Sequence, residues 1–196
     1  MVLMADKTKD EARKYTIFEE EFLPLSNALY NFAYHLTLSE ADANDLVQEA
    51  YLKAFRFINS YEVGTNPKAW LFKILKNAFI NKYRKESKQP NKTPFDEIIK
   101  RQDDDHSPYS TYEDLRTEMF DNMMGDEVTS AIDSLQVDAR TVILLSDIEG
   151  FTYEEISKIV NIPIGTVRSR LFRARNTLKK RLLEYASSLG YEDKRK

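Results

Sequence analysis

The side chains with the clearest chemical potential lie near the C-terminus, on a segment with helical periodicity. At about 100° per residue its apolar residues share one side, and they are Val167, Leu171, Ala174 and Leu178. Two guanidinium groups, a hydroxyl and an aromatic ring share the other, from Arg168, Ser169, Phe172 and Arg173. Arginine can fork onto guanine, serine can bond phosphates, and phenylalanine can contact a thymine methyl. The set favours contact with duplex DNA, although a solvated basic face has the same composition.

A second predicted helix directly precedes this one. Thr152 and Glu155 have the spacing of a capping box, in which the threonine caps the helix and the glutamate reaches back to its N–H. A break at residues 161–165 separates the two, and we expect the next helix to begin at Thr166. A helix, a short turn and a second helix form the arrangement that presents a recognition helix to the major groove.

A polar helical face is predicted in residues 42–55. On a helical wheel the apolar residues share one half, and the other half carries Asp45, Gln48, Glu49 and Leu52. A lone exposed leucine is ordinary on a protein surface. Set among fixed carboxylates and amides, Leu52 equally fits the centre of a protein-docking surface.

A cationic helical face is predicted in residues 66–85. Pro67 suits the first turn, and Trp70 is expected in the core. The outward side carries Lys73, Lys76, Asn77 and Arg84, a composition that suits contact with a nucleic-acid backbone and its bases. Just before this helix, the short loop that begins at Tyr61 could hold an unstacked base.

Charge is strongly segregated along the 196 residues, although the formal net charge is only -3. Residues 66–88 contain seven cations and one acid, and residues 161–183 contain seven cations and no acid. Between them, residues 89–126 contain ten acids and four cations. Two basic modules with an acidic segment between them suggest two contacts with one polyanion.

Composition excludes several other functions. The chain has no cysteine and two histidines, so disulfides, thiolate zinc sites and histidine-rich metal sites are not expected. No glycine-rich phosphate loop or catalytic triad spacing is present, and we expect no enzymatic activity, catalytic residue, cofactor, metal or small-molecule substrate. The chain lacks an apolar run of membrane-spanning length and an N-terminal signal pattern, so we expect no membrane insertion and a cytoplasmic location.

The periodicity predicts an all-α protein with two small helical domains. The first is expected at residues 14–88 and the second, a C-terminal helix-turn-helix domain, at residues 126–189. Prolines at positions 90 and 94 end the first run of helices. Residues 89–125 are expected to form an acidic flexible linker, with one short helix near 114–123.

The segments, in this order, resemble the extracytoplasmic-function (ECF) sigma factors of the sigma-70 family. Residues 42–55, centred on Asp45-Leu46-Val47-Gln48-Glu49, are similar to the family's polymerase-binding helix, and residues 66–84 to its −10 element helix. Residues 135–140, 150–156 and 164–175 are similar to its −35-binding domain. Ser157 stands where that domain usually has alanine, and both residues are small. Asn161 replaces a common turn glycine, and asparagine tolerates left-handed geometry.

The resemblance implies a role for each candidate residue. Asp45, Gln48, Glu49 and Leu52 would bind the clamp of the core RNA polymerase β′ subunit. Tyr61, Lys73, Lys76, Asn77 and Arg84 would contact the melted −10 strand of promoter DNA, and Arg168, Ser169, Phe172 and Arg173 the −35 element. Such a factor directs polymerase to promoters, often of stress-response genes. The runs at residues 64–72 and 80–85 are together similar to a subgroup controlled by zinc-containing, thiol-stress-sensing anti-sigma factors, which implies an anti-sigma partner.

Two other functions stay open from the residues themselves. A DNA-binding response regulator would need a receiver domain with alternating strands and helices, and the N-terminal half shows no strands. A protein-interaction module could use the same basic helices on acidic partners or RNA.

Overall fold

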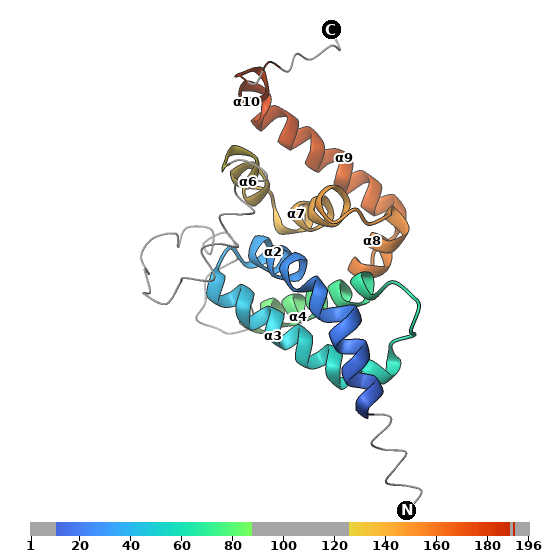
Figure 1. Ribbon diagram of the computed structural model, residues 1–196. Coiled ribbons are helices and arrows are strands. Elements are labelled where there is room, and N and C mark those ends of the chain that lie inside the picture. Colours follow the sequence, from blue (N-terminus) through green and yellow to red (C-terminus); the bar gives the residue numbers. More distant parts are fainter. Residues whose placement is uncertain (1–10, 88–125, 189, 191–196) are drawn as a thin grey trace, which may run out of the picture.

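The computed structural model describes residues 11–87, residues 126–188 and Gly190 (Figure 1). Within these ranges every regular element is a helix, which confirms the prediction of an all-α protein. The expected acidic linker at residues 89–125, and the short helix expected near 114–123, lie outside the described residues.

The N-terminal group of helices carries the two polar faces predicted for the first half of the chain. Residues 11–17 are helical. They are followed by η1 (Phe18–Phe22), η2 (Leu23–Leu25), α2 (Ser26–Thr37), α3 (Glu40–Arg56), η3 (Ile58–Ser60) and α4 (Pro67–Ser87). Helix α3 packs against both α2 and α4, so the outward faces of α3 and α4 belong to one body (Figure 1).

Local sequence explains where the helices begin and end. Leu38 closes α2 in the left-handed conformation, with φ of 55°, and its N–H donates to the carbonyl of Tyr34. Ser39 then caps α3, because its side chain accepts a hydrogen bond from the N–H of Asp42. Asn66 caps α4 in the same way, accepting from the N–H of Ala69 at 3.0 Å.

The core of this group is apolar and rich in aromatic rings. The predicted inward stripe of α3 is buried at Ala43, Leu46, Ala50 and Ala54. Trp70 stacks on Phe22 with ring centroids 5.3 Å apart, which places its ring against the core as expected. This aromatic pair joins η1 to α4, because Phe22 lies on η1 and Trp70 on α4.

The C-terminal group consists of short helices and one long one. They are α6 (Asp126–Asp133), α7 (Val137–Ile143), η5 (Leu144–Ile148), α8 (Tyr153–Val160), α9 (Ile164–Arg181) and α10 (Leu183–Ser188). Helix α9 packs against α7 and α8. Its predicted inward side packs on the core, because Val167, Leu171 and Ala174 are buried and Leu178 is partly buried against them.

Helices α8 and α9 form the predicted helix-turn-helix. The capping box of Thr152 and Glu155 is present, and Asn161 ends α8 in the left-handed conformation with φ of 55°. The expected start of α9 at Thr166 was wrong by two residues. Helix α9 begins at Ile164 because the carbonyl of Pro163 accepts from the N–H groups of Thr166 and Val167. Gly165 therefore lies inside the first turn and does not break it.

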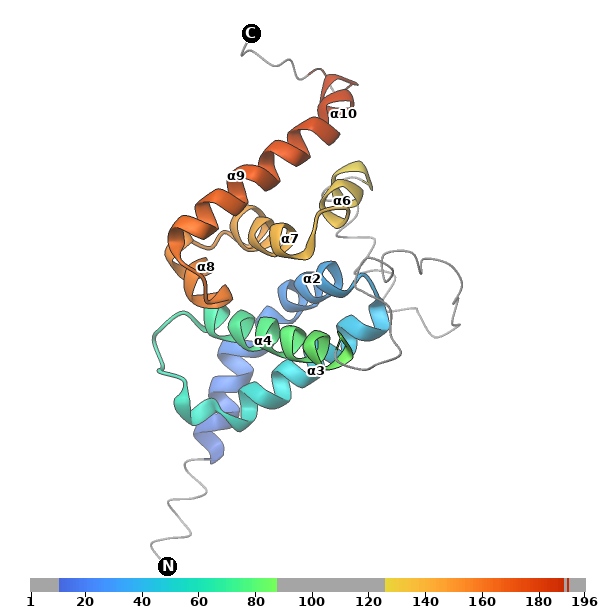
Figure 2. The same ribbon diagram turned by 180° about the vertical axis from the view of Figure 1, so that it is seen from behind.

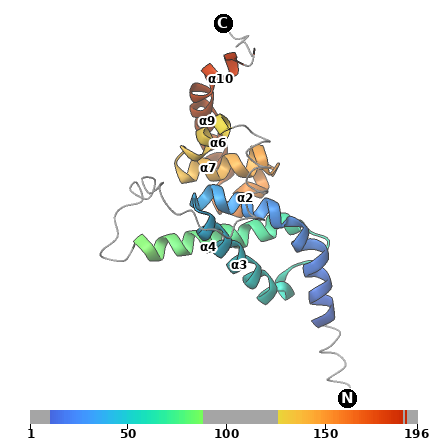
Figure 3. The same ribbon diagram turned by 60° about the vertical axis from the view of Figure 1, so that its left-hand side comes forward.

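The two groups of helices contact each other. Helix α4 lies beside α8, and α2 lies beside α7 (Figures 2 and 3). Phe72 on α4 is fully buried between the ring of Phe32 in its own group and the ring of Phe151, which precedes α8. In the described part of the chain, no helix combines the length and apolar character that a membrane crossing requires.

Candidate functional site

The outward face of α3 combines acidic, amide and apolar groups. Asp45 and Gln48 are exposed, and the side chain of Leu52 is 73% exposed. The carboxylate of Glu49 forms an ion pair with Lys53, one turn later, at 2.5 Å. All four predicted residues therefore lie on one accessible face, and an isolated leucine among polar groups is suited to a small pocket on another protein.

The predicted cationic face of α4 is only partly exposed. Lys73 and Asn77 are exposed, while Lys76 is half-buried and donates a hydrogen bond to the carbonyl of Val160 at 3.0 Å. The side chain of Arg84 lies outside the part that the structure describes. Thus the structure brings two of the predicted residues together at the surface and directs a third toward α8.

Tyr61 lies in the core at the start of the loop before α4. Its ring packs on Phe22 and Trp70, and its hydroxyl donates a hydrogen bond to the carboxylate of Glu21. Burial, together with the hydrogen bond and the charge of Glu21, raises the pKa of Tyr61 to about 12. The hydroxyl is therefore neutral at any physiological pH. The accessible part of the loop is residues 62–66.

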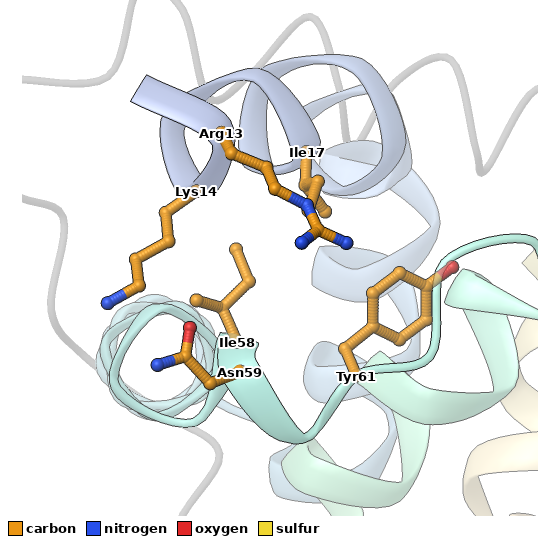
Figure 4. Close-up of a pocket in the computed structure, with 6 residues that line it drawn as sticks. All are labelled: Arg13, Lys14, Ile17, Ile58, Asn59 and Tyr61. Atoms are coloured by element: carbon orange, nitrogen blue, oxygen red, sulfur yellow. The ribbon is translucent and has the colours of Figure 1, made fainter. Parts of the chain in front are cut away.

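A polar cavity of about 230 Å³ lies beside Tyr61 (Figure 4). Arg13, Lys14 and Ile17 form the side contributed by residues 11–17, and Ile58, Asn59 and Tyr61 form the other side. The guanidinium of Arg13 points toward the cavity and the tyrosine ring (Figure 4). Tyr61 therefore forms part of the cavity wall, with the guanidinium of Arg13 as the cationic group on its side (Figure 4).

The outward face of α9 is fully accessible. Arg168, Ser169 and Arg173 are exposed, and the ring of Phe172 is 68% exposed. The hydroxyl of Ser169 donates to the carbonyl of Thr166, and Nε of Arg173 donates to the carbonyl of Ser169. The four predicted residues lie together as expected, and the hydrogen bonds of Ser169 and Arg173 hold their side chains close to the helix.

Two other arginines of the basic C-terminal segment hold the domain together. Arg170 forms an ion pair with Asp138 at 2.8 Å. Arg175 donates to both carboxylate oxygens of Asp147 and to the hydroxyls of Ser146 and Tyr153. The hydrogen bonds with Asp147 and Tyr153 raise the pKa of Arg175 above its usual range. Counting cations along the chain could not distinguish these two from the arginines that face outward, because their partners lie on other helices.

Acidic and histidine side chains form no metal site in the described ranges. No group of three or more His, Asp or Glu residues there is arranged to hold a metal ion.

Comparison with known proteins identifies both groups of helices. The family model described as Sigma-70 region 2 matches residues 22–89, and the model described as Sigma-70, region 4, matches residues 125–178. The chain is 31% identical over 182 residues to the ECF RNA polymerase sigma factor SigE of Mycolicibacterium smegmatis, covering 93% of this chain and 67% of that protein. It is 32% identical over 137 residues to the ECF RNA polymerase sigma-E factor of Escherichia coli K12, covering 70% and 72% of the two chains.

Solved structures resemble the chain across both groups of helices. The sigma factor RpoE of Bartonella quintana, in complex with the anti-sigma factor NepR, matches with a TM-score of 0.62 and 31% identity, over 84% of this chain and 96% of that one. CnrH, in complex with the cytosolic domain of CnrY, matches with a TM-score of 0.55 over 89% and 90% of the two chains. At 20% identity, the second match shows a shared fold alone.

Proposed function

Since the chain belongs to the ECF sigma factors of the sigma-70 family, it is an alternative RNA polymerase sigma factor and not an enzyme, and we propose which of its surfaces perform each step of initiation. The observation that carries the proposal is the presence of three separate polar faces, on α3, α4 and α9, on a chain with these two family regions. Residues 14–88 would act as the first domain, residues 126–189 as the second, and residues 89–125 as the linker.

The face of α3 is the proposed site for core polymerase. Asp45, Gln48 and Glu49 would bond polar groups of the β′ clamp, and Leu52 would fill an apolar pocket there. Support comes from the exposure of Leu52, whose apolar surface is removed from water only when a partner covers it. Interface energy is commonly concentrated in one such central anchor with a polar rim.

The face of α4 is the proposed site for the melted −10 strand. Lys73 and Asn77 are accessible to phosphates and base edges, and Lys76 and Arg84 would extend this face along the helix. Extruding a base from the duplex costs a few kcal/mol of free energy, because the base loses its pairing and stacking. The loop after Tyr61, with the ring edge that lines the cavity of Figure 4, would compensate part of that cost by stacking and hydrogen bonding.

The face of α9 is the proposed reader of the −35 element. Helix α9 is the second helix of a helix-turn-helix, the element that enters the major groove in this motif. Arg168 and Arg173 would fork onto guanine or bind phosphates, Ser169 would bond a phosphate or base edge, and Phe172 would contact a thymine methyl.

An anti-sigma protein is the proposed regulatory partner. One solved structure that is 31% identical to this chain is a complex of a sigma factor with an anti-sigma factor. A zinc-containing anti-sigma factor and a stress-response regulon are the finer expectations from the sequence. Affinity purification of the tagged chain from its native cell, with metal analysis of any co-purifying inhibitor, tests the first expectation. An inhibitor without zinc would contradict it.

Binding to core polymerase tests the division of surfaces. Glu49→Lys reverses a charge on the α3 face and should weaken core binding by tenfold or more, because it places a cation where the β′ clamp meets a carboxylate. Glu20→Lys is the matched control, since Glu20 is an exposed glutamate of η1 outside all three faces. Equal core affinities of the two variants, measured by fluorescence anisotropy of labelled protein, would contradict the assignment of α3.

A further inference from the structure

The phenol of Tyr61 is bonded to a carboxylate from a distant part of the sequence. Glu21 lies on η1, 40 residues earlier, and accepts a hydrogen bond from the Tyr61 hydroxyl. An ionised carboxylate only accepts hydrogen bonds, so the phenol proton is directed at Glu21. Figure 4 shows this hydroxyl at the end of the ring that points away from Ile58 and Asn59. The bond therefore connects the residue that precedes the loop of residues 62–66 to η1.

The turn that carries Glu21 is unusual and is bonded to a neighbouring helix. Element η1 is a single π-helical turn of five residues. Such turns are rare and occur frequently at functional sites. The hydroxyl of Tyr51 on α3 donates to the carbonyl of Phe22, the last residue of this turn, at 3.1 Å. The Glu21 carboxylate is thus presented from a turn that is itself held in place.

The ring of Tyr61 packs on two other aromatic rings. Its centroid lies 5.1 Å from that of Phe22 and 5.2 Å from that of Trp70. Burial, followed by the hydrogen bond and charge of Glu21, raises the pKa of Tyr61 to about 12, whereas a hydrogen bond with the side chain of Thr65 acts in the opposite direction. Thr65 therefore lies beside the phenol, which contacts both η1 and the loop.

The loop of residues 62–66 has few bonds of its own. The hydroxyl and the N–H of Thr65 both donate to the carbonyl of Glu62, at 2.6 and 3.2 Å. Gly64 between them has φ of 88°, a conformation that favours glycine. At the far end, Asn66 caps α4. All five residues are exposed, and exposed segments with few buried contacts open easily. The shape of the loop therefore depends on its two anchors, the phenol and the helix cap.

Capture of an extruded base is stronger when the loop has its final shape before the strand arrives. The extruded base has already lost its pairing and stacking. A loop that became ordered only on binding would lose conformational entropy as well, and that loss would be subtracted from the affinity. The bond between Tyr61 and Glu21 is present in the protein without DNA, so this anchor of the loop is set in advance.

We propose that Glu21 is a positioning residue for base capture at the −10 element, an inference that rests on the proposed function of the loop after Tyr61. Through the phenol of Tyr61, Glu21 holds residues 62–66 in the shape that receives the extruded base. The faces for core polymerase and for the −35 element lie on α3 and α9. Loss of the Glu21 carboxylate therefore reduces base capture and leaves binding at those two faces unchanged.

A cycle that combines protein variants with abasic DNA tests the proposal. Holoenzyme formed with the full chain would initiate on an intact promoter, and on versions in which one base of the −10 element is replaced by an abasic site. Each position is tested on either strand in turn. The position at which the wild type loses most initiation, about tenfold or more, marks the captured base. Glu21→Ala should initiate less on the intact promoter and lose less than about twofold more at that abasic position, because the missing base is one that it no longer captures.

Three further variants distinguish positioning from a general loss of structure. Glu21→Gln keeps an acceptor oxygen for the phenol and should recover most of the abasic effect. Tyr61→Phe removes only the hydroxyl and should behave like Glu21→Ala, so the test does not depend on Glu21→Ala being well folded. Glu20→Ala is the matched control, since Glu20 is an exposed glutamate of the same turn, and it should lose as much initiation at the abasic position as the wild type.

Stability and the other two faces are measured in parallel. Urea unfolding followed by Trp70 fluorescence, affinity for core polymerase and affinity for duplex carrying the −35 element should each be similar in Glu21→Gln and the wild type. A Glu21 that only stabilised the fold would lower the unfolding midpoint in Glu21→Ala without changing the ratio of initiation on intact and abasic promoters.

Two outcomes separate the positioning role from the function on which it rests. If Glu21→Ala and Tyr61→Phe both lose as much initiation at the abasic position as the wild type, the positioning role is overturned and the proposed function of the loop stands. If the wild type is indifferent to abasic sites throughout the −10 element, the proposed function of the loop is overturned and the positioning role with it.

Discussion

The ring of Phe72 on α4 lies 5.3 Å from the ring of Phe151, across the boundary between the two sigma regions. Phe72 is fully buried, and its other neighbour is Phe32 of its own region. One phenylalanine thus belongs to the core of the first region and to the contact with the second. The stability of the first region should therefore respond to a change in the other.

Phe151→Ala should lower the midpoint of urea unfolding of the first region. Trp70 is the single tryptophan and lies on α4, so its fluorescence reports that region. Removing the opposing ring should cost about 0.5–1.5 kcal/mol through the lost aromatic pair. Phe172→Ala, which truncates an exposed ring of the second region, is the control. Identical midpoints for the wild type and both variants would show that the regions do not touch in solution.

Leu52→Ala should weaken core polymerase binding without changing the stability of the protein. Its side chain is 73% exposed, so truncation loses no folded contact of consequence. A buried anchor at an interface is typically worth more than about 1 kcal/mol, or roughly fivefold in affinity. Leu23→Ala removes another exposed leucine and should leave affinity unchanged. Equal affinities for core polymerase would remove Leu52 from the docking surface.

Arg173→Ala should weaken binding to a duplex that carries the −35 element. Loss of a base contact should cost about 1–3 kcal/mol of binding free energy and weaken the sequence preference at one base pair of the −35 element. Loss of a phosphate contact should instead reduce the slope of log binding constant against log salt concentration by about 0.9. Titrations at several salt concentrations therefore show which contact Arg173 makes. Lys158→Ala, which removes an exposed cation of α8 outside the α9 face, is the control. If Arg173→Ala binds the duplex with the affinity and salt dependence of the wild type, the DNA-reading face lies elsewhere.

Arg175→Lys should destabilise the second region although the charge is kept. The guanidinium bonds Asp147, Ser146 and Tyr153 at once, and an ammonium cannot reproduce that fork. We expect a lower Tm, with weaker duplex binding only to the extent that the region unfolds. An unchanged Tm together with lost DNA affinity would contradict the structural role of Arg175 and would make it a DNA contact.

The second region should lose stability in acid through Asp147. Burial alone would raise the pKa of Asp147, but the hydrogen bonds from Arg175 and Ser146 outweigh it and hold the pKa below its usual range. A lowered pKa means that the stabilisation is present above about pH 4 and is lost as pH falls through the lowered value. The difference in Tm between the wild type and Asp147→Asn should therefore shrink below about pH 4. A constant difference from pH 7 to pH 3 would contradict this.

The hydrophobic periodicity was sufficient to predict the exposed faces of α3 and α9, because each of these helices has one buried side. The stripe of Val167, Leu171 and Ala174 is buried. The predicted outward residues are exposed, namely Arg168, Ser169, Phe172 and Arg173. The capping box of α8 could also be predicted from the sequence, because Thr152 and Glu155 exchange their side-chain-to-backbone hydrogen bonds within one turn.

The exposed face of helix α4 was harder to predict from the sequence, because two sides of this helix are covered by other helices. Phe72 and Lys76 face partners 79 and 84 residues away in sequence, Phe151 and Val160, and no local pattern contains that information. Tyr61 was expected at an accessible loop, but its ring packs in the core on Phe22 and Trp70, and its hydroxyl donates to Glu21, 40 residues earlier. Arg170 and Arg175 were counted among the seven cations of residues 161–183, and that count could not show that Asp138 and Asp147 on other helices pair with them.

Mapping of transcript 5′ ends tests the central claim most directly. Core polymerase would transcribe fragmented native DNA with and without this protein, and the RNA ends would be sequenced. We predict a set of start positions that depends on the protein, each preceded by two shared elements near −10 and −35, and lost with Glu49→Lys but kept with Glu20→Lys. The same start positions with core polymerase alone would contradict the account.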